Sequence, residues 1–288
     1  MNYPSDPIVG WFSGGVTSAV AVKLTIDIWG EKNVRAVFID TMNEDPDTYR
    51  FKDECEAWYG IKIETIRTEL YGNIQEVWHR FKGMNFAHGA ICSTELKRRV
   101  RTKWQAENKF SFQVFGFDIR EPRRAEAFTK NYGNTNPIYP LLLFGWDKNK
   151  CIQFMHEQGI QVPKAYEYGF NNNNCLRTGC VQGGIGYWQL MREKFPGKFA
   201  RMAAKEHELT ELKGSPVTML KDQGKEAKQT GNQLVFLTPH PNYPDIKDLS
   251  MMKGRPPKPL LDCNGFCGTN DLKRNPTEDE INFADGQT

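Results

Sequence analysis

The first 170 residues alternate between short apolar runs and longer stretches in which apolar positions have helical spacing. The apolar runs, which indicate strands, occupy residues 8–14, 34–41, 61–67 and 110–118. The stretches that indicate helices occupy residues 18–30, 46–60, 73–83 and 148–159. Strands that alternate with helices of this length predict βαβ units, and therefore an α/β fold with a parallel sheet and helices on both faces.

The pattern changes after residue 170. A polar segment at 171–180 precedes a helical region at 186–212, and proline-rich loops follow at 239–271. The polar segment 273–288 is expected to be frayed. We therefore predict two units: an α/β nucleotide-binding domain in residues 1–170, and a cysteine-containing helical and loop-rich extension in residues 171–288 that packs on it.

The overall charge narrows the range of ligands. The 288 residues carry a formal net charge of +3 and have an isoelectric point of about 8.4. This mild basicity permits an anionic ligand such as a nucleotide, but it is far from that of a dedicated nucleic-acid-binding module. The chain contains no apolar run long enough to cross a bilayer, and its first residues lack the apolar core of a signal peptide. We expect a cytoplasmic protein without a membrane partner, where disulfides are rare.

A glycine-rich turn, Ser-Gly-Gly-Val-Thr-Ser at residues 13–18, joins the first predicted strand to the first predicted helix. Glycine lets the backbone approach an oxyanion, and a helix N-terminus offers unpaired N–H groups and a positive dipole end. The candidate phosphate-binding residues are Ser13, Gly14, Gly15, Val16, Thr17 and Ser18. The pattern matches neither a Walker loop nor a dinucleotide-binding turn. A serine-capped turn without a ligand is the simpler alternative.

Together with three later segments, this turn resembles the N-type ATP pyrophosphatases, and in particular the phosphoadenylyl-sulfate reductase family and its sulfur-activating relatives. The later segments are FIDTMNEDPDT, FGFDIREPRRAEAF and the stretch from YPLLLFGWDKNK to NNNNCLRTGC, and they occur in the family's order. The resemblance covers roughly residues 8–185. Thr17 is a departure, because the family usually has Asp or Lys at this position of its pyrophosphate-binding loop.

The resemblance implies the fold of the adenine nucleotide alpha hydrolases, with ATP or another adenine nucleotide as ligand and Mg²⁺ as a further candidate. By that likeness, Asp40 and Thr41 end the second strand beside the glycine-rich turn, while Gly116, Glu121 and Arg124 lie at the mouth of the site. Ligands of open α/β sheets bind at this edge. Simpler explanations exist for single residues, since Asp40 suits a helix cap and Arg124 a solvated surface.

The seven cysteines of a protein expected to be reduced require an explanation other than disulfides. Cys55 and Cys151 fall in helical patterns and are expected to be buried. The resemblance implies that others hold an iron–sulfur cluster, as they do in some members of the family. The candidate ligands of a [4Fe-4S] cluster are Cys92, Cys175, Cys180 and one of Cys263 and Cys267. Zinc held by the last four of these cysteines is the rival, and unligated thiols are the third alternative.

The basic segment ELKRRVRTKW supplies Lys97, the preferred catalytic cation, and the resemblance adds Asp40 and Arg124 as catalytic candidates. By this likeness we predict an ATP-dependent sulfurtransferase that adenylates its substrate, a nucleic acid or a nucleotide, before sulfur insertion. A partner that supplies sulfur, such as a cysteine desulfurase, is expected. One alternative is a sulfonucleotide reductase, although the chain lacks that group's Glu-Cys-Gly-x-His motif. The other is a nucleotide-binding protein without turnover that holds structural zinc.

Overall fold

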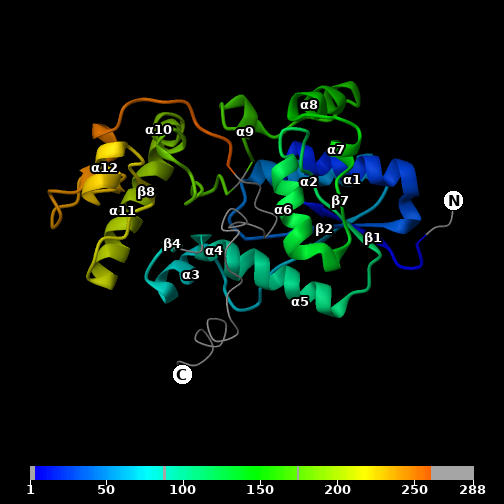
Figure 1. The fold of residues 1–288 in the computed structure, drawn as a ribbon, viewed down its shortest axis with the longest axis horizontal. Coiled ribbons are helices and arrows are strands. Elements are labelled where there is room, and N and C mark those ends of the chain that lie inside the picture. Colours follow the sequence, from blue (N-terminus) through cyan, green and yellow to red (C-terminus); the bar gives the residue numbers. More distant parts are fainter. Residues whose placement is uncertain (1–3, 87–88, 174, 261–288) are drawn as a thin grey trace.

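The main sheet of the protein consists of parallel strands. The structure is a computed structural model that describes residues 4–86, 89–173 and 175–260 (Figure 1). Its five-stranded sheet has the order β3-β2-β1-β6-β7, and every pairing in it is parallel. The strands are β1 (Ile8–Phe12), β2 (Val34–Ile39), β3 (Ile63–Ile66), β6 (Phe112–Val114) and β7 (Pro137–Ile138). Parallel neighbours need crossover connections, which the intervening helices supply.

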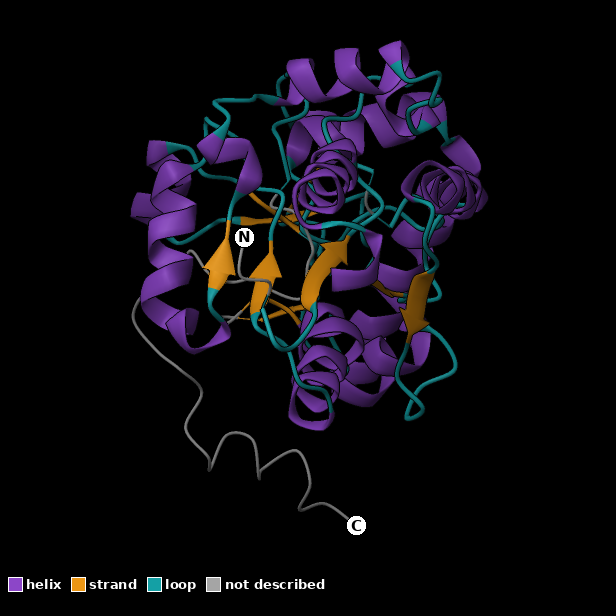
Figure 2. Ribbon diagram, turned by 90° about the vertical axis from the view of Figure 1, so that its right-hand side faces the viewer, coloured by secondary structure: helices purple, strands orange, loops and turns teal. Residues whose placement is uncertain are grey.

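Helices cover both faces of this sheet, which confirms the predicted fold class (Figure 2). One face packs on α1 (Val16–Trp29), α2 (Pro46–Tyr59) and α8 (Lys148–Glu157), and the other on α5 (Arg99–Glu107) and α6 (Pro122–Tyr132). Successive side chains of a strand point to opposite faces. All five residues of β1 are therefore buried, which explains why the strand shows no polar alternation.

A second hydrophobic core lies at the other end of the molecule, where Figure 1 shows α10, α11 and α12. It combines α3 (Ile74–Phe81), α10 (Ile185–Lys194) and α11 (Pro196–Lys213) with a small sheet of order β10-β9-β8. Because α3 precedes residue 170 and still packs here, this core draws on both sides of the predicted domain boundary. The division at residue 170 stays a prediction.

The sequence analysis did not predict the small sheet, because its strands are very short. They are β8 (Leu220–Lys221), β9 (Leu234–Phe236) and β10 (Lys247–Asp248). The helical region predicted at 186–212 divides into α10 and α11 at Pro196, which lacks the N–H that a continuous helix needs. The remaining elements are β4 (Asn85–Phe86), β5 (Gly89–Ala90), α4 (Ile91–Ser93), α7 (Pro140–Leu143), α9 (Lys164–Glu167), α12 (Lys225–Thr230), the π-helical η2 (Thr94–Arg98), and the 3-10 turns η1 (Glu31–Asn33), η3 (Gly133–Thr135) and η4 (Leu249–Met251).

Candidate functional site

Residues 13–18, here called the glycine loop, connect the central strand β1 to α1. Ser18 organises the loop: its Oγ accepts hydrogen bonds from Ser13 N (3.0 Å) and Ser13 Oγ (2.8 Å) and donates one to the Gly15 carbonyl oxygen (2.9 Å). Gly14 has a φ of +80°, in the left-handed region that glycine enters without strain. The two serine hydroxyls therefore hold the turn in shape, and its backbone N–H groups are the donors suited to an anion.

Tyr166 closes the N-terminus of α1. Its hydroxyl oxygen accepts a hydrogen bond from the backbone N–H of Val16 at 3.2 Å. The ammonium group of Lys148 lies 5.9 Å from the centre of the Tyr166 ring. An oxyanion bound at this helix N-terminus would replace the phenol oxygen as the acceptor of the Val16 N–H. The tyrosine thus occupies the place where the sequence predicts a phosphate.

Gly116 brings the end of β6 against the glycine loop. A Cβ atom on Gly116 would lie 2.6 Å from the backbone nitrogen of Ser18, so the two backbones touch. The other two residues predicted at the mouth of the site pair with each other. Glu121 and Arg124 form an ion pair at the start of α6, and the guanidinium group of Arg124 lies 4.7 Å from the centre of the Phe117 ring. Their roles in binding or catalysis stay predictions.

Asp40 follows the carboxyl end of β2, as expected, and it is not a helix cap. Its Oδ1 accepts hydrogen bonds from Met42 N (2.7 Å) and from the Tyr49 hydroxyl (2.8 Å). Burial raises the pKa of Tyr49, and its hydrogen bond to Asp40 raises it further. The cap of α2 is Asp45, whose side chain accepts a hydrogen bond from Asp47 N. Asp40 therefore keeps a polar carboxylate, half-buried, at the ligand-binding edge of the sheet.

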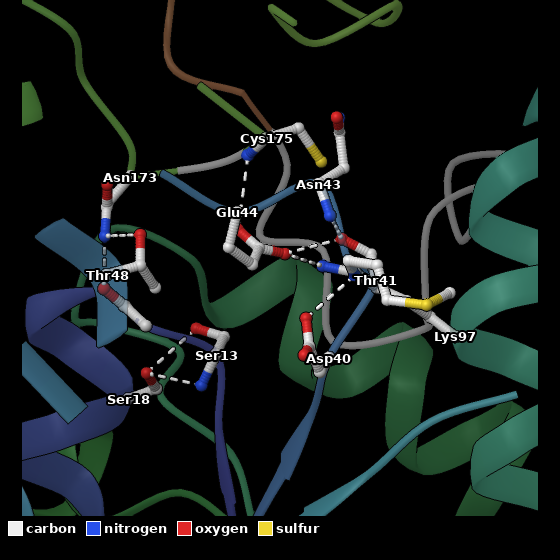
Figure 3. Close-up of polar contacts among 12 residues, drawn as sticks. Ser13, Ser18, Asp40, Thr41, Asn43, Glu44, Thr48, Lys97, Asn173 and Cys175 are labelled. Atoms are coloured by element: carbon white, nitrogen blue, oxygen red, sulfur yellow. Dashed lines mark hydrogen bonds and ion pairs between the residues drawn. The ribbon is translucent and has the colours of Figure 1, made fainter. Parts of the chain in front are cut away.

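A buried acidic and basic pair lies beside this edge (Figure 3). Glu44 and Lys97 are 2% and 5% exposed, and Lys97 Nζ lies 3.7 Å from Glu44 Oε1. The same oxygen accepts a hydrogen bond from the Thr41 hydroxyl at 2.9 Å, and Glu44 Oε2 accepts one from Cys175 N at 3.4 Å. Lys97 comes from η2, and π-helical turns of this kind are frequent at functional sites. Thr41 thus hydrogen-bonds to the same carboxylate that accepts the backbone N–H of Cys175.

Asn173 fixes the segment before Cys175 to the glycine loop. Its side-chain Nδ2 donates hydrogen bonds to the Gly14 carbonyl oxygen (2.9 Å) and to Thr48 Oγ1 (3.0 Å). Cys175 follows two residues later with a φ of +47°, a backbone conformation that residues other than glycine rarely adopt. Figure 3 shows these contacts as neighbouring groups: Ser13 with Ser18, Asn173 with Thr48, and Cys175 with Glu44.

Three of the predicted metal ligands meet. Cys92, Cys175 and Cys180 line one small cavity of about 20 Å³, together with Thr41, Ser93 and Lys97. Cys175 and Cys180 are buried, and Cys92 is half-buried. We call this cavity the cysteine pocket. The other two candidate ligands, Cys263 and Cys267, lie outside the described residues.

The described residues do not present a preformed metal site. In residues 4–86, 89–173 and 175–260, no group of three His, Cys, Asp or Glu side chains is close enough to hold one metal ion. The cysteine pocket is apolar, and three sulfurs and the side chain of Lys97 line it. The metal group and its ligands stay predictions.

The two cysteines predicted to be structural are confirmed as core residues. Cys55 in α2 and Cys151 in α8 are 0% exposed and pack under the main sheet. Burial raises the pKa of both thiols, that of Cys151 to about 12. Neither is therefore suited to act as a thiolate.

Sequence reasoning missed several residues of this region. Glu44 and Asn173 lie inside segments that were singled out, FIDTMNEDPDT and NNNNCLRTGC, but nothing in either segment distinguishes them from their polar neighbours. Tyr166 is separated from the glycine loop by 150 positions, and no local pattern relates the two. Only the tertiary fold brings these three side chains to the site.

Known proteins resemble the chain over part of its length. Residues 7–182 match the family model described as the phosphoadenosine phosphosulfate reductase domain. An uncharacterised protein of Methanocaldococcus jannaschii is 28% identical over 198 residues, which are 66% of this chain and 39% of that protein. The chain thus spans well under half the length of this relative. Among the described helices, none combines the length and the apolar character needed to cross a membrane.

Two solved structures are similar at lower identity. A phosphoadenylyl-sulfate reductase from Candida auris, solved as a phosphate complex, is 16% identical with a TM-score of 0.44, and the match covers 59% of this chain and 80% of that one. The U34-tRNA thiolase NcsA from Methanococcus maripaludis, solved with its [4Fe-4S] cluster, is 12% identical with a TM-score of 0.38. That match covers 72% of each chain.

Proposed function

The chain belongs to the phosphoadenosine phosphosulfate reductase family, and from this membership we propose that it is an ATP-dependent sulfurtransferase. In this proposal the glycine loop binds the phosphates of the nucleotide, and the cysteine pocket carries the sulfur chemistry. One observation supports it above the others: Asn173 hydrogen-bonds to the glycine loop, and two residues later Cys175 lines the cysteine pocket. A nucleotide and a sulfur centre would therefore act side by side.

The nucleotide would bind at the carboxyl ends of β1, β2 and β6. Backbone N–H groups of the glycine loop and the positive end of the α1 dipole would hold the phosphates, after Tyr166 yields the Val16 N–H. Asp40 is placed to hold Mg²⁺, because carboxylate oxygens are the ligands that this ion prefers. Gly116 lets the segment that follows β6 pack directly on the loop, because any side chain there would displace the backbone of Ser18.

The reaction we propose has two steps. An oxygen of the acceptor attacks the α-phosphorus of ATP, so that an oxygen–phosphorus bond forms and pyrophosphate leaves. A sulfur nucleophile then displaces AMP, which departs with that oxygen, and the carbon–oxygen bond of the acceptor is exchanged for a carbon–sulfur bond. Lys97, buried beside Glu44, would balance negative charge next to the cysteine pocket.

A [4Fe-4S] cluster would be held by Cys92, Cys175 and Cys180, and when bound it supplies an iron site at which a sulfur atom can be carried. The described chain ends close to this pocket, since Leu260 N donates a hydrogen bond to the Asn172 side chain at 2.8 Å. Cys263 follows three positions later in the sequence, and it or Cys267 is our candidate for a movable fourth ligand, which the incoming sulfur would replace. Sulfur would come from a partner protein such as a cysteine desulfurase.

Pyrophosphate release tests this proposal. Anaerobically purified protein would be given ATP, a sulfide source and a single-stranded nucleic acid, and pyrophosphate and AMP would be measured together. We expect both products in equal amounts, and their loss in Gly116→Ala but not in Gly133→Ala, where an added Cβ meets no atom within 4 Å. Tight ATP binding without either product would instead indicate a nucleotide-binding protein, and sulfite formed from a sulfonucleotide with a dithiol would indicate a reductase.

A further inference from the structure

A groove with basic walls lies next to the cysteine pocket. It has a volume of about 590 Å³ and runs between the β4–β5 hairpin, the start of α10, β8 and the segment that ends the described chain. Its cations come from three separate elements: Lys213 ends α11, Lys221 lies in β8, and Arg255 and Lys258 belong to the final segment. No Asp or Glu is among the described residues that line it. We call it the basic groove.

The lysines of the basic groove are not neutralised by ion pairs. Within the described part of the chain, none of the three forms one. Asp222, next to Lys221 in the sequence, interacts with Arg255, but its closest contacts are Gly224 N and Lys247 at 2.9 Å, which lower its pKa. The N-terminus of α10, at Ile185, also lines the groove and adds the positive end of a helix dipole. The groove is thus suited to a ligand with several negative charges.

The basic groove adjoins the cysteine pocket through two shared residues. Val181 and Gln182 line both cavities. The hairpin wall is fixed to them, since Asn85 Nδ2 donates a hydrogen bond to the Val181 carbonyl oxygen at 2.6 Å. On the same hairpin Phe86 also lines the groove and is 40% exposed, although it is a large apolar side chain. An exposed aromatic ring in a basic groove offers a surface on which a nucleobase can stack.

The wall opposite the hairpin is held against α10. Gln189 Nε2 donates hydrogen bonds to the carbonyl oxygens of Met252 (3.1 Å) and Lys253 (3.3 Å), and its Oε1 accepts one from Arg255 N (3.1 Å). A Cβ atom on Gly186 would lie 2.3 Å from the Pro256 carbonyl oxygen, so this segment rests directly on the helix backbone. The positions of Arg255 and Lys258 therefore depend on the absence of a side chain at residue 186.

We propose that the basic groove binds a single strand of nucleic acid. The groove has more cations, on three separate elements, than one phosphate group requires. They suit the repeated phosphates of a nucleic-acid strand. Lysine and arginine bind such phosphates whatever the base sequence. The strand's phosphates lie on the groove cations and one base stacks on Phe86, so that the neighbouring base reaches Gln182 and the cysteine pocket. Naming this strand as the sulfur acceptor rests on the proposed function, whereas its binding does not.

Fluorescence anisotropy with labelled oligonucleotides tests the groove without any turnover. The probes are oligo(dT) and oligo(U), which distinguish DNA from RNA, and the same strand annealed into a duplex serves as competitor. In the double variant Lys213→Gln/Lys221→Gln we expect about tenfold weaker binding at moderate salt. A plot of the logarithm of the binding constant against the logarithm of the salt concentration should become less steep, by about 0.7 for each phosphate that the protein no longer neutralises. Lys225→Gln/Lys228→Gln, on exposed α12 positions outside the lining, removes the same charge and is expected to bind within about twofold of the wild type.

A second pair of variants leaves the charge unchanged. Gly186→Ala shifts the segment that carries Arg255 and Lys258 and is expected to weaken binding severalfold, whereas Gly133→Ala, which lies outside the lining and whose Cβ would meet no atom within 4 Å, is not. Equal losses in the two lysine variants would overturn the proposal, as would preference for the duplex or binding of AMP but of neither oligonucleotide. Loss of pyrophosphate release with intact oligonucleotide binding would refute the proposed function alone.

Discussion

Asn173 donates a hydrogen bond from its side-chain Nδ2 to the Gly14 carbonyl oxygen, 2.9 Å away, although 159 positions separate them. The same amide contacts Thr48 at 3.0 Å, and Cys175 follows two residues later. The segment that lines the cysteine pocket is therefore fixed to the glycine loop close to Cys175. The proposed function needs this proximity, because it places a nucleotide on the loop and the sulfur chemistry in the pocket.

Substitution of Asn173 tests that connection. Asn173→Ala removes two buried hydrogen bonds and leaves the Gly14 carbonyl oxygen without this donor, a loss of about 1 kcal/mol for each bond. We expect weaker binding of ATP, by about fivefold to thirtyfold, measured by isothermal titration calorimetry. Asn232→Ala, an exposed position, is the matched control and is expected to bind as the wild type does. Equal affinities in all three proteins would show that Asn173 does not support the glycine loop.

Gly116 provides a steric test of where the nucleotide binds. Gly116→Ala places a Cβ atom 2.6 Å from Ser18 N, a backbone atom that moves only with the glycine loop. We expect a loss of about 1–3 kcal/mol in the free energy of unfolding, together with the loss of ATP binding. Gly133→Ala adds the same methyl group where nothing lies within 4 Å. A Gly116→Ala protein that binds ATP normally would place the nucleotide elsewhere.

Substitutions of Lys97 and Glu44 test whether Lys97 contributes to stability alone or also to the reaction. Lys97→Met leaves the carboxylate of Glu44 buried without its cation, and we expect a loss of about 3 kcal/mol in the free energy of unfolding. Lys62→Met removes an exposed lysine from Glu56, which keeps its pairing with Lys52, and is expected to cost less than about 1 kcal/mol. Urea unfolding measures both effects.

The double variant completes this test. Lys97→Met combined with Glu44→Gln removes both buried charges, so most of the stability is expected to return. We expect Lys97→Met to abolish pyrophosphate release, because it removes the cation beside the cysteine pocket. The double variant still lacks this cation, so its pyrophosphate release should not recover. Recovery of activity along with stability would mean that Lys97 serves only to neutralise Glu44.

Glu206 on α11 predicts a pH dependence of stability. Its carboxyl group is fully buried and accepts hydrogen bonds from Met219 N (2.7 Å) and Leu237 N (2.6 Å). Burial raises its pKa from 4.5 to about 8, although the two N–H donors oppose the shift. Because the folded pKa exceeds the unfolded one, the folded state binds the extra proton. The stability from this group is complete below about pH 4.5 and is lost as the pH rises towards 8.

Glu206→Gln replaces the carboxyl group with an amide that does not bind or release a proton in this pH range. We expect the free energy of unfolding of the wild type to fall relative to that of Glu206→Gln between about pH 5 and pH 8, measured by urea unfolding across that range. All other titratable groups are the same in the two proteins, so their contributions cancel in the difference. Parallel pH profiles for the two proteins would show that Glu206 is ionised in the folded state.

The sequence predicted four of the five strands of the main sheet, and the turn that forms the glycine loop, because these depend on local patterns. The fifth strand, β7, has two residues and was not predicted. The apolar run of β1, the following glycines and the start of α1 are contiguous, and periodicity decides each of them. Lys97 and three of the cysteines were also predicted, through the order of the motifs. They lie around one pocket because α4, η2 and the loop that precedes α10 meet there in the tertiary fold.

The remainder of the site depends on tertiary contacts that no local pattern encodes. Tyr166 reaches the glycine loop from α9, and Glu44 differs from the acidic residues around it only by being buried against Lys97. The basic groove was equally hidden, since its cations lie far apart in a chain of nearly balanced charge. Short strands such as β8 gave too little periodicity to predict the sheet that carries Lys221.

The central claim, that the cysteine pocket is a sulfur centre coupled to the nucleotide, is tested most directly by metal analysis of anaerobically purified protein. We predict about four irons and about four sulfides per chain, lost in Cys92→Ala, Cys175→Ala and Cys180→Ala but retained in Cys151→Ala, whose thiol lies in the core of the main sheet. One zinc per chain without iron, or iron that survives all three pocket substitutions, would contradict the account.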